Sequence, residues 1–540
     1  MEKIEQIREI LKKRIKSRSD LMRAKREVAK KNNLSLFSNA EVIKGYRELV
    51  ESGKIKANTD LENVLRKRSV RTLSGIAPVA VLTKPFGCPG KCAYCPTEKD
   101  VPQSYLSNEP AVMRAIRCGY NPAVQVNDRL QALINNGHNP TKIEVIVIGG
   151  TWSYFPDKYK FWFVVNLFAA ANDYLKNQKL KIKNQKISTE KYDYSLSLVE
   201  LKKALVLEQK KNEKAVYQII GLTLETRPDY INKKELEQMR ELGCTRVEVG
   251  VQQIDDKILK KNKRGHGVKE IADATSLLKN YGFKVTYHLM PGLPGSTAEK
   301  DFTLFKKLFS DPRFQPDQIK FYPTVVTKGS LLYRWWQKGK YKPYSDKVLQ
   351  ELIIKCKQAV PKYVRIIRLI RDIPGESIMA GNLITNLRQV MKDKGVECNC
   401  IRCREAQDKK MNLKDLELNI ENYDSAGGQE YFISFDSKDG KTLFGFARLF
   451  LPGNSKVGIN KIFGKSAIVR ELHVYGELVA IGDKKKVQHS GLGKRLLDEA
   501  QSIALGYCRE KMVIISGVGV REYYRKLGYK LKETYMVKDI

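Results

Sequence analysis

The sequence Cys88-Pro-Gly-Lys-Cys92-Ala-Tyr-Cys95 decides the fold of this chain. It places three thiols on one short loop, with three and then two intervening residues, directly after the apolar run Ala77–Leu82. Three thiolates hold three irons of a 4Fe–4S cube and leave the fourth iron open to another molecule. The alternative is a zinc site that lacks one ligand.

A repeated pattern surrounds this loop. From about residue 73 to 330, short apolar runs alternate with helical stretches, which indicates parallel strands joined by crossover helices. The fold class is therefore α/β, and we expect a partial (β/α)6 barrel in which the loops after the strands build the active site. The predicted strands are Ala77–Leu82, Ile143–Ile148, Gln218–Leu224, Val247–Val251, Val285–Leu289 and Ile319–Tyr322.

The cysteine spacing, with an aromatic residue before the third thiol, is similar to that of the radical S-adenosylmethionine (radical SAM) superfamily. This resemblance implies that Cys88, Cys92 and Cys95 bind a 4Fe–4S cluster and that S-adenosylmethionine binds the open iron. Both cofactors are therefore expected at the loop that follows the first strand.

Further candidate residues for binding S-adenosylmethionine follow the next strands. The resemblance implies that Gly149 and Gly150, after the second strand, receive the methionine end of this cofactor through backbone groups. Glu225 ends the third strand, where a carboxylate can accept hydrogen bonds from ribose hydroxyls, and Gln252 ends the fourth. A Gly-Gly pair alone is usually a turn, so the assignment rests on the shared position of these residues after successive strands.

After about residue 405 the pattern changes to longer β-rich runs, a Gly-rich loop, a helix, a strand and a last helix, which marks a separate α+β domain. The Gly-rich loop precedes a helix that begins near Lys494, so its backbone amides and the helix N-terminus suit a pyrophosphate. The order of elements resembles the GNAT acetyltransferase fold, and a different phosphate-binding loop is the alternative. The expected acetyl-CoA ligands are Gln488, His489, Ser490, Gly491, Leu492, Gly493 and Tyr524.

A second group of thiols, Cys398-Asn-Cys400-Ile-Arg-Cys403, lies between these two parts of the chain. Three soft ligands within six residues favour tetrahedral zinc, and a structural zinc site needs a fourth ligand. We assign His473 to that position. A second iron–sulfur cluster, and a histidine that is only hydrogen-bonded in a core, are the alternatives.

The composition indicates a polyanionic partner. Lys and Arg number 98 against 60 Asp and Glu, a formal net charge of +38, and such a charge attracts phosphates, although a Lys-rich proteome is the alternative. Apolar residues at helical spacing predict an amphipathic basic helix within residues 1–35, with a solvated helix face as the alternative. The expected phosphate contacts are Lys12, Lys13, Arg14, Arg66, Lys67 and Arg68.

No stretch approaches the roughly 20 apolar residues that span a bilayer, and the start lacks the apolar stretch of a secretory signal. We therefore expect a cytoplasmic protein with no membrane partner. The uneven spacing of the ten cysteines in such a chain points to metal ligands rather than disulfides.

Several motifs together closely resemble the catalytic subunit of Elongator in its bacterial or archaeal single-chain form. They are Cys88–Cys95, Glu109–Ile116, Leu224–Asp229, Met290–Gly295, Arg470–Tyr475, Gln488–Gly493 and Ser516–Tyr524. The chain departs from the family at Thr97-Glu98, where paired glycines are common, and in an enlarged segment near residues 178–214. Neither departure touches a cluster ligand.

This resemblance implies a tRNA uridine acetyltransferase that makes the carboxymethyl precursor at carbon 5 of the wobble uridine in the anticodon stem-loop. The 5′-deoxyadenosyl radical would remove a hydrogen from the acetyl methyl group of acetyl-CoA, the carbon radical would add to carbon 5, and hydrolysis of the thioester would follow. Tyr523 and Tyr524 match the family's tyrosines near the CoA sulfur, and core packing is the alternative for both. A protein lysine acetyltransferase with a structural cluster is the competing function.

The expected organisation has four parts: a basic helical segment over residues 1–72, the radical SAM barrel over 73–370, a zinc-binding linker over 371–410 and the GNAT domain over 411–540. A homodimer remains open, and no accessory subunit is implied.

Overall fold

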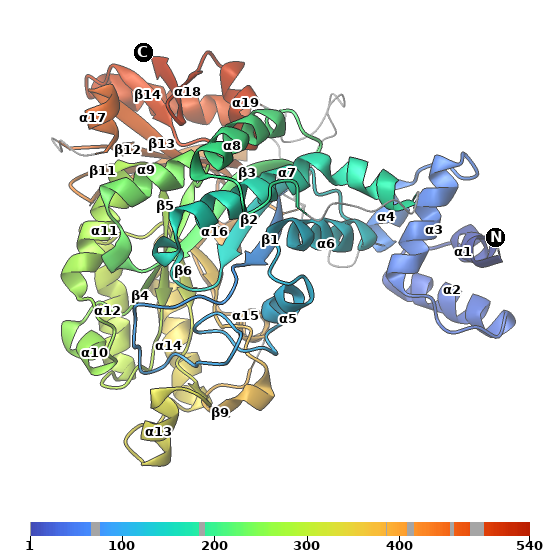
Figure 1. Ribbon diagram of the computed structural model, residues 1–540, viewed down its shortest axis with the longest axis horizontal. Helices are drawn as coiled ribbons and strands as arrows, with labels where there is room; N and C mark the ends of the chain where they lie inside the picture. The colour runs from blue at the N-terminus through green and yellow to red at the C-terminus, as the bar shows by residue number, and fades with distance from the viewer. Residues whose placement is uncertain are drawn as a thin grey trace.

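A computed structural model of the protein describes residues 2–65, 76–182, 190–384, 386–407, 415–453, 458–475 and 491–540. It has a helical N-terminal part, drawn in blue, a central barrel, drawn from the blue of β1 through green to yellow, and a C-terminal sheet, drawn in orange to red (Figure 1). The barrel strands run between the C-terminal part and the loop that carries Cys88.

The N-terminal part consists of α1 (Glu2–Lys12), α2 (Arg18–Lys31), α3 (Asn39–Glu51) and α4 (Thr59–Leu65). A capping box at Ser17 starts α2, so the predicted basic helix is two helices and not one. Their apolar faces form a core of their own, separate from that of the barrel. One contact between α3 and the barrel part is a hydrogen bond of 2.8 Å, which the Arg47 guanidinium donates to the carbonyl of Ile134.

The barrel sheet confirms the predicted partial barrel and adds one strand to it. Its parallel strands, in spatial order, are β1 (Ile76–Leu82), β2 (Lys142–Ile148), β3 (Gln218–Thr226), β4 (Arg246–Gln252), β5 (Lys284–Leu289), β6 (Gln318–Phe321) and β8 (Arg365–Arg368). β8 was not predicted, because this short edge strand begins and ends with arginine. Only its pairing with β6 identifies it.

Helices cover the outside of this sheet (Figure 1). They include α6 (Pro122–Asn135), α7 (Asp157–Ile182), α8 (Leu198–Asn212), α9 (Lys233–Glu241), α10 (Asp256–Lys261), α11 (Val268–Asn280), α12 (Ala298–Ser310) and α14 (Asp346–Ala359). The enlarged segment forms α8 and the end of α7, which pack side by side. Among the described helices, none is long and apolar enough to cross a membrane.

The inner face of the barrel is polar. Every second side chain of β4, β5 and β6 forms hydrogen bonds or ion pairs with side chains of the neighbouring strand, so these residues share one face of the sheet. The residues between them, such as Val247 and Val285, belong to the apolar core. The polar set is Arg246, Glu248, Thr286, His288, Gln318 and Lys320. A polar interior suits a reaction chamber better than a packed barrel core.

The C-terminal sheet has the spatial order β10 (Leu416–Ser425), β11 (Gly428–Ser437), β12 (Leu443–Leu451), β13 (Ser466–Val474), β14 (Lys511–Ile514), β16 (Tyr535–Asp539) and β15 (Lys530–Lys532). Its strands pair antiparallel except β13 and β14, which are parallel. With α18 (Leu492–Gly506) and α19 (Arg521–Arg525), this sheet confirms the predicted α+β part.

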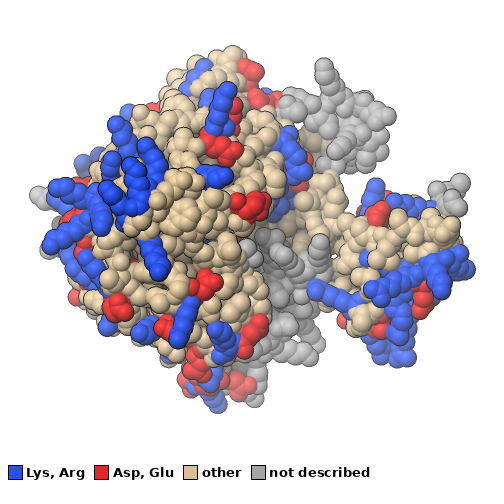
Figure 2. Space-filling view, turned by 90° about the horizontal axis from the view of Figure 1, so that it is seen from below, with Lys and Arg blue, Asp and Glu red and all other residues tan. Residues whose placement is uncertain are grey.

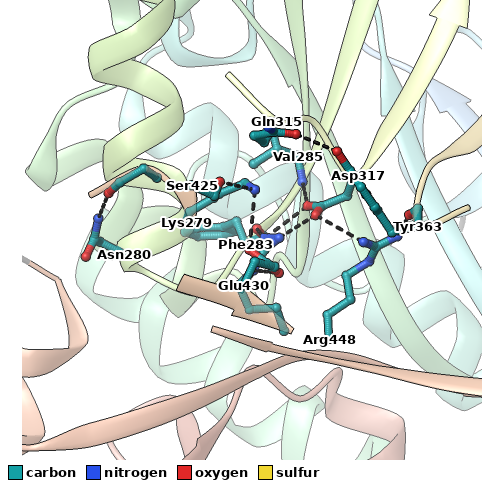
Figure 3. Close-up of polar contacts among 12 residues, drawn as sticks. Lys279, Asn280, Phe283, Val285, Gln315, Asp317, Tyr363, Ser425, Glu430 and Arg448 are labelled. Atoms are coloured by element: carbon teal, nitrogen blue, oxygen red, sulfur yellow. Dashed lines mark hydrogen bonds and ion pairs between the residues drawn. The ribbon is translucent and has the colours of Figure 1, made fainter. Parts of the chain in front are cut away.

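This sheet packs on the amino ends of the barrel strands through a buried ionic network (Figure 3). Asp317, just before β6, accepts hydrogen bonds from the Arg470 guanidinium and from the Val285 amide, at 2.9 and 2.7 Å. Arg448 lies 3.7 Å from the same carboxylate, and Lys279 of α11 lies 3.3 Å from Glu430 of β11. The side chains of these ion pairs are fully buried, so the two sheets form one continuous core.

Candidate functional site

The loop after β1 brings the first three cysteines to the carboxyl end of the sheet. Cys92 is buried, and Cys88 and Cys95 are half-buried. The Arg264 guanidinium donates a hydrogen bond of 3.3 Å to the Cys92 sulfur, and that of Arg227 lies 3.9 Å from it. Neither arginine was predicted as a site residue.

These contacts favour the thiolate that iron binds. A hydrogen bond from Cys95 lowers the pKa of the Cys92 thiol, and burial opposes this effect. The charges of Arg264 and Arg227 also lower it, so the pKa of Cys92 lies well below its usual value. The Cys92 and Cys95 thiols contact each other beside two guanidinium groups, which suits an anionic iron–sulfur cluster. The sulfurs of Cys88, Cys92 and Cys95 do not all lie within 4.8 Å of one another, so the structure brings these three predicted ligands to one loop without closing them into a compact group. Arg227 lies within the quoted Leu224–Asp229 motif, but no local pattern marks Arg264.

The glycine pair after β2 borders this loop. Gly149 and Gly150 have positive φ values of 130° and 104°, which favour glycine. A Cβ atom on Gly149 would lie 2.1 Å from the Thr83 hydroxyl, so only glycine fits this close approach. The Cys88 sulfur lies 3.8 Å from the hydroxyl of Thr151, which directly follows Gly150. The structure thus brings the predicted glycines beside the cysteine loop.

Glu225 is the last but one residue of β3, and Gln252 ends β4, so both lie at the carboxyl ends of adjacent strands. The Tyr105 hydroxyl donates a 3.1 Å hydrogen bond to one oxygen of Glu225, and His288 Nδ1 lies 3.7 Å from the other. Gln252 has a φ of +68°, and its buried Oε1 has no hydrogen-bond partner among the described residues. An unpaired acceptor there suits a donor from a bound nucleotide, because a buried orphan oxygen is costly.

Charges line the chamber behind Glu225. His288 Nε2 lies 2.9 Å from Glu248, which also pairs with Lys320. Burial alone would raise the pKa of Glu248, but the charge of Lys320, together with His288 and Arg246, holds it well below its usual value. Glu248 therefore stays ionised inside the barrel.

The second cysteine group also forms in the structure. The sulfurs of Cys398, Cys400 and Cys403 lie within 4.8 Å of one another. A hydrogen bond from Cys398 lowers the pKa of the buried Cys400 thiol, and Cys403 adds to the effect. This arrangement fits three ligands of a tetrahedral metal site.

The structure does not bring His473 to these three sulfurs, and among the described residues no His, Asp, Glu or further Cys joins them. The His473 ring lies in β13 with its centroid 4.3 Å from that of Tyr475, and burial lowers its pKa to about 3. Its Nε2 has no hydrogen-bond partner in the described part of the chain. The residue was assigned from type alone, and the fold of β13 points it elsewhere.

The Gly-rich loop of the C-terminal part is described only at its end, because Gln488, His489 and Ser490 lie outside the described residues. Gly491 has a φ of +79° and caps α18, which begins at Leu492. A Cβ atom on Gly493 would lie 2.7 Å from the Tyr523 hydroxyl, so this tyrosine lies over the helix N-terminus. The Tyr523 side chain is 41% exposed, whereas Tyr524 is buried, which raises its pKa.

The opening between β13 and β14 lies in the same region. The two strands pair only from Ser466–Lys511 to Val469–Ile514, and β13 continues to Val474 paired with β12 alone. Backbone groups beyond Val469 are therefore free of a β14 partner on that side.

The basic segments have a mixed outcome. Lys12 and Arg14 are exposed near the end of α1, and Lys13 forms an ion pair with Glu27 of α2. Arg66, Lys67 and Arg68 lie outside the described residues. Figure 2, the view from below, shows Lys and Arg covering much of the N-terminal part at the right.

Comparisons with known proteins agree with this geometry. Residues 83–305 match the Radical SAM superfamily, and residues 316–394 match the Radical_SAM C-terminal domain. The chain is 43% identical to a tRNA uridine(34) acetyltransferase of Dehalococcoides mccartyi, over 88% of this chain and all of that protein. It is 38% identical to Elongator complex protein 3 of Homo sapiens, over 88% of this chain and 86% of that protein.

A solved structure is similar as well. It is the archaeal Methanocaldococcus infernus Elp3 with an N-terminal deletion of residues 1–46, with 38% identity and a TM-score of 0.71. The match covers 87% of this chain and 100% of that one. The similarity therefore spans the barrel and the C-terminal sheet together.

Proposed function

The chain belongs to the radical SAM superfamily and, within it, to the family of the tRNA uridine(34) acetyltransferases and Elongator complex protein 3; on this premise we propose that it carboxymethylates carbon 5 of the wobble uridine of tRNA. It is an enzyme of the transferase class. Its proposed substrates are acetyl-CoA and the anticodon stem-loop of a cytoplasmic tRNA.

The target atom dictates the type of chemistry. Carbon 5 of uracil is not acidic and does not attack a thioester, so ordinary acyl transfer to it is unreasonable. When bound, the iron–sulfur cluster and S-adenosylmethionine supply a 5′-deoxyadenosyl radical that activates the acetyl methyl group. The protein's part is to bind, orient and shield the reactants.

The barrel residues have defined roles in this proposal. Cys88, Cys92 and Cys95 hold the cluster, and Arg264 and Arg227 balance its negative charge. Gly149 and Gly150 offer backbone groups to the methionine end of S-adenosylmethionine. Glu225 and the unpaired oxygen of Gln252 accept hydrogen bonds from its ribose and adenine parts. The proposal is supported by the position of all these groups at the carboxyl ends of adjacent strands.

We assign residues 411–540 to a GNAT-type domain that binds acetyl-CoA. The N-terminus of α18, with Gly491, Leu492 and Gly493, suits the pyrophosphate, since its free amides and helix dipole attract negative charge. The opening between β13 and β14 leaves backbone groups for the pantetheine arm. The Tyr523 hydroxyl over Gly493 is then a candidate to orient the thioester, with Tyr524 packed behind it.

We assign the barrel of residues 73–370 to the radical reaction. We assign residues 371–410 to a linker that holds zinc on Cys398, Cys400 and Cys403.

Residues 1–72 are the proposed tRNA-binding segment. Reversing the charges of Lys12 and Arg14 should weaken tRNA binding and flatten its salt dependence, because fewer counterions are released. Unchanged affinity across a salt series would remove this segment from the RNA interface.

The observation that carries the proposal is the Cys92 thiol held by two buried guanidinium groups, on a loop whose Cys88 contacts Thr151 next to the positive-φ Gly149–Gly150 pair. The test is to incubate the reconstituted protein with tRNA and acetyl-CoA, with and without S-adenosylmethionine, under reducing conditions. Mass spectrometry of the nucleosides should show carboxymethyluridine only with the cofactor, together with 5′-deoxyadenosine.

Cys92→Ser is the matched control and should form neither product while still binding tRNA. If lysine acetylation occurs without S-adenosylmethionine and no modified uridine forms, the protein acetyltransferase is the correct function instead.

A further inference from the structure

Exposed aromatic rings surround the cysteine loop. Phe86, two residues before Cys88, lies with its ring centroid 5.9 Å from that of Tyr154, and Tyr154 lies 5.8 Å from Tyr230. Phe86 and Tyr154 are 39% and 42% exposed. Soluble proteins bury most rings of this size, so adjacent exposed rings mark a binding surface.

These rings are held from behind. Phe155 stacks on Phe86 and on Tyr159, each with a centroid separation of 4.7 Å and planes within 25° of parallel. Trp162 continues the row from Tyr159 to Tyr194, which is 40% exposed. We name Phe86, Tyr154, Tyr194 and Tyr230 the aromatic platform; its buried supports fix the orientation of its rings at little cost in entropy.

The platform lies at the mouth of the barrel. Phe86, Tyr154 and Tyr230 follow β1, β2 and β3, and the carboxyl ends of parallel strands meet at one edge. A Cβ atom on Gly87 would lie 3.7 Å from the Tyr154 ring, so this ring lies against the backbone next to Cys88. A ligand on the platform would therefore border the cysteine loop.

Lysines accompany the rings. The Lys84 ammonium lies 5.0 Å from the ring centroid of Tyr159 and 5.8 Å from that of Tyr194, and Lys158 lies 5.0 Å from Tyr194. Lys91 is exposed in the cysteine loop itself. Among the described residues, neither Lys84 nor Lys91 forms an ion pair with a carboxylate, so both charges are available to an anion.

We propose that the aromatic platform stacks unpaired bases of the substrate RNA next to the reacting uridine, while Lys84, Lys91 and Lys158 attract the phosphates between them. The inference rests on the proposed function, because it names where the RNA lies at the same site. Aromatic faces accept any base, and a lysine-lined groove follows the backbone, which is the usual chemistry of single-stranded recognition. A duplex offers no free base face to these rings.

The experiment measures binding of the full-length protein to two labelled RNAs: an anticodon stem-loop, and a fully paired duplex of equal length. Tyr154→Ala should weaken stem-loop binding about ten-fold and leave duplex binding unchanged, because one stacking partner is lost. Tyr154→Phe keeps the ring face and should stay within about two-fold of the wild type. Tyr507→Ala is the matched control, because Tyr507, directly after α18, is also exposed (51%); this variant should bind like the wild type.

A second variant guards against local misfolding. Lys84→Gln leaves the rings in place and should lower the salt dependence of stem-loop binding, with an unchanged unfolding midpoint.

The outcomes separate this inference from the proposed function. If the wild type shows no preference for the stem-loop and modifies no uridine, the proposed function fails. If the wild type prefers the stem-loop but Tyr154→Ala and Lys84→Gln bind it equally well, only the platform is rejected. The platform is also rejected if these variants keep their RNA affinity but lose reduction by an acidic electron-carrier protein, since a protein would then dock there.

Discussion

Replacing Asp317 with asparagine tests the network that joins the barrel to the C-terminal sheet. The substitution keeps the size of the side chain and removes its charge. Asp317 is fully buried and faces Arg470 and Arg448, with Lys279 close by. Arg470 and Arg448 keep their other partners Glu430 and Glu471, but the buried network is left with one positive charge in excess. Removing one partner of a buried pair costs roughly 3–5 kcal/mol.

This loss is large because folded proteins are stable by only about 5–15 kcal/mol. Equilibrium urea unfolding followed by circular dichroism should therefore show a clearly lower free energy of unfolding for Asp317→Asn. The matched control is Asp273→Asn in α11, where a 59% exposed carboxylate pairs with the exposed Lys269. Exposed pairs contribute about 0–1 kcal/mol, so the control should unfold nearly like the wild type.

The pH dependence gives the same test a second readout. Burial alone would raise the pKa of Asp317, but the charges of Arg470, Lys279 and Arg448 outweigh it and hold the pKa below its usual value. A lowered pKa in the folded state stabilises the protein above the unfolded pKa of about 3.9, and this contribution is lost as the pH falls through the folded value. The gap between wild type and Asp317→Asn should therefore narrow only in acid. Equal stability of both proteins at pH 7 would refute the reasoning.

Three further predictions concern single residues. Burial alone would raise the pKa of Glu208, but hydrogen bonds to its carboxylate outweigh burial and lower the pKa to about 2. Urea unfolding of Glu208→Gln at pH 7 should therefore show a free energy of unfolding lower than the wild-type value by roughly 1–3 kcal/mol. This difference between the two proteins should vanish as the pH falls from about 4.3 toward 2. Arg264→Met should raise the pKa of the Cys92 thiol, and the cluster-free protein should then react more slowly with iodoacetamide near pH 6; an unchanged rate would contradict the role of the guanidinium. If the proposed zinc binds at the second cysteine group, His473→Phe should retain it in metal analysis and Cys403→Ser should lose it; loss of zinc from His473→Phe would restore the histidine as a ligand.

Much of the site could be predicted because its signals are local. The spacing of Cys88, Cys92 and Cys95 is a property of one loop. The apolar residues of the first six barrel strands are recognisable because they recur in short runs and pack into the core. Gly149 and Gly150 were recognised by type and position, and their positive φ values explain why glycine is needed there. These features depend on neighbours within a few residues, so a linear sequence displays them.

The tertiary structure alone decided which distant groups meet. Arg264 reaches the Cys92 sulfur across 172 positions of sequence, and Arg470 reaches Asp317 across 153. His473 was assigned to zinc by residue type, yet β13 holds it away from the cysteines. A charged side chain carries no local mark of its partner, because the pairing energy arises only when packing brings both groups into the same low-dielectric interior.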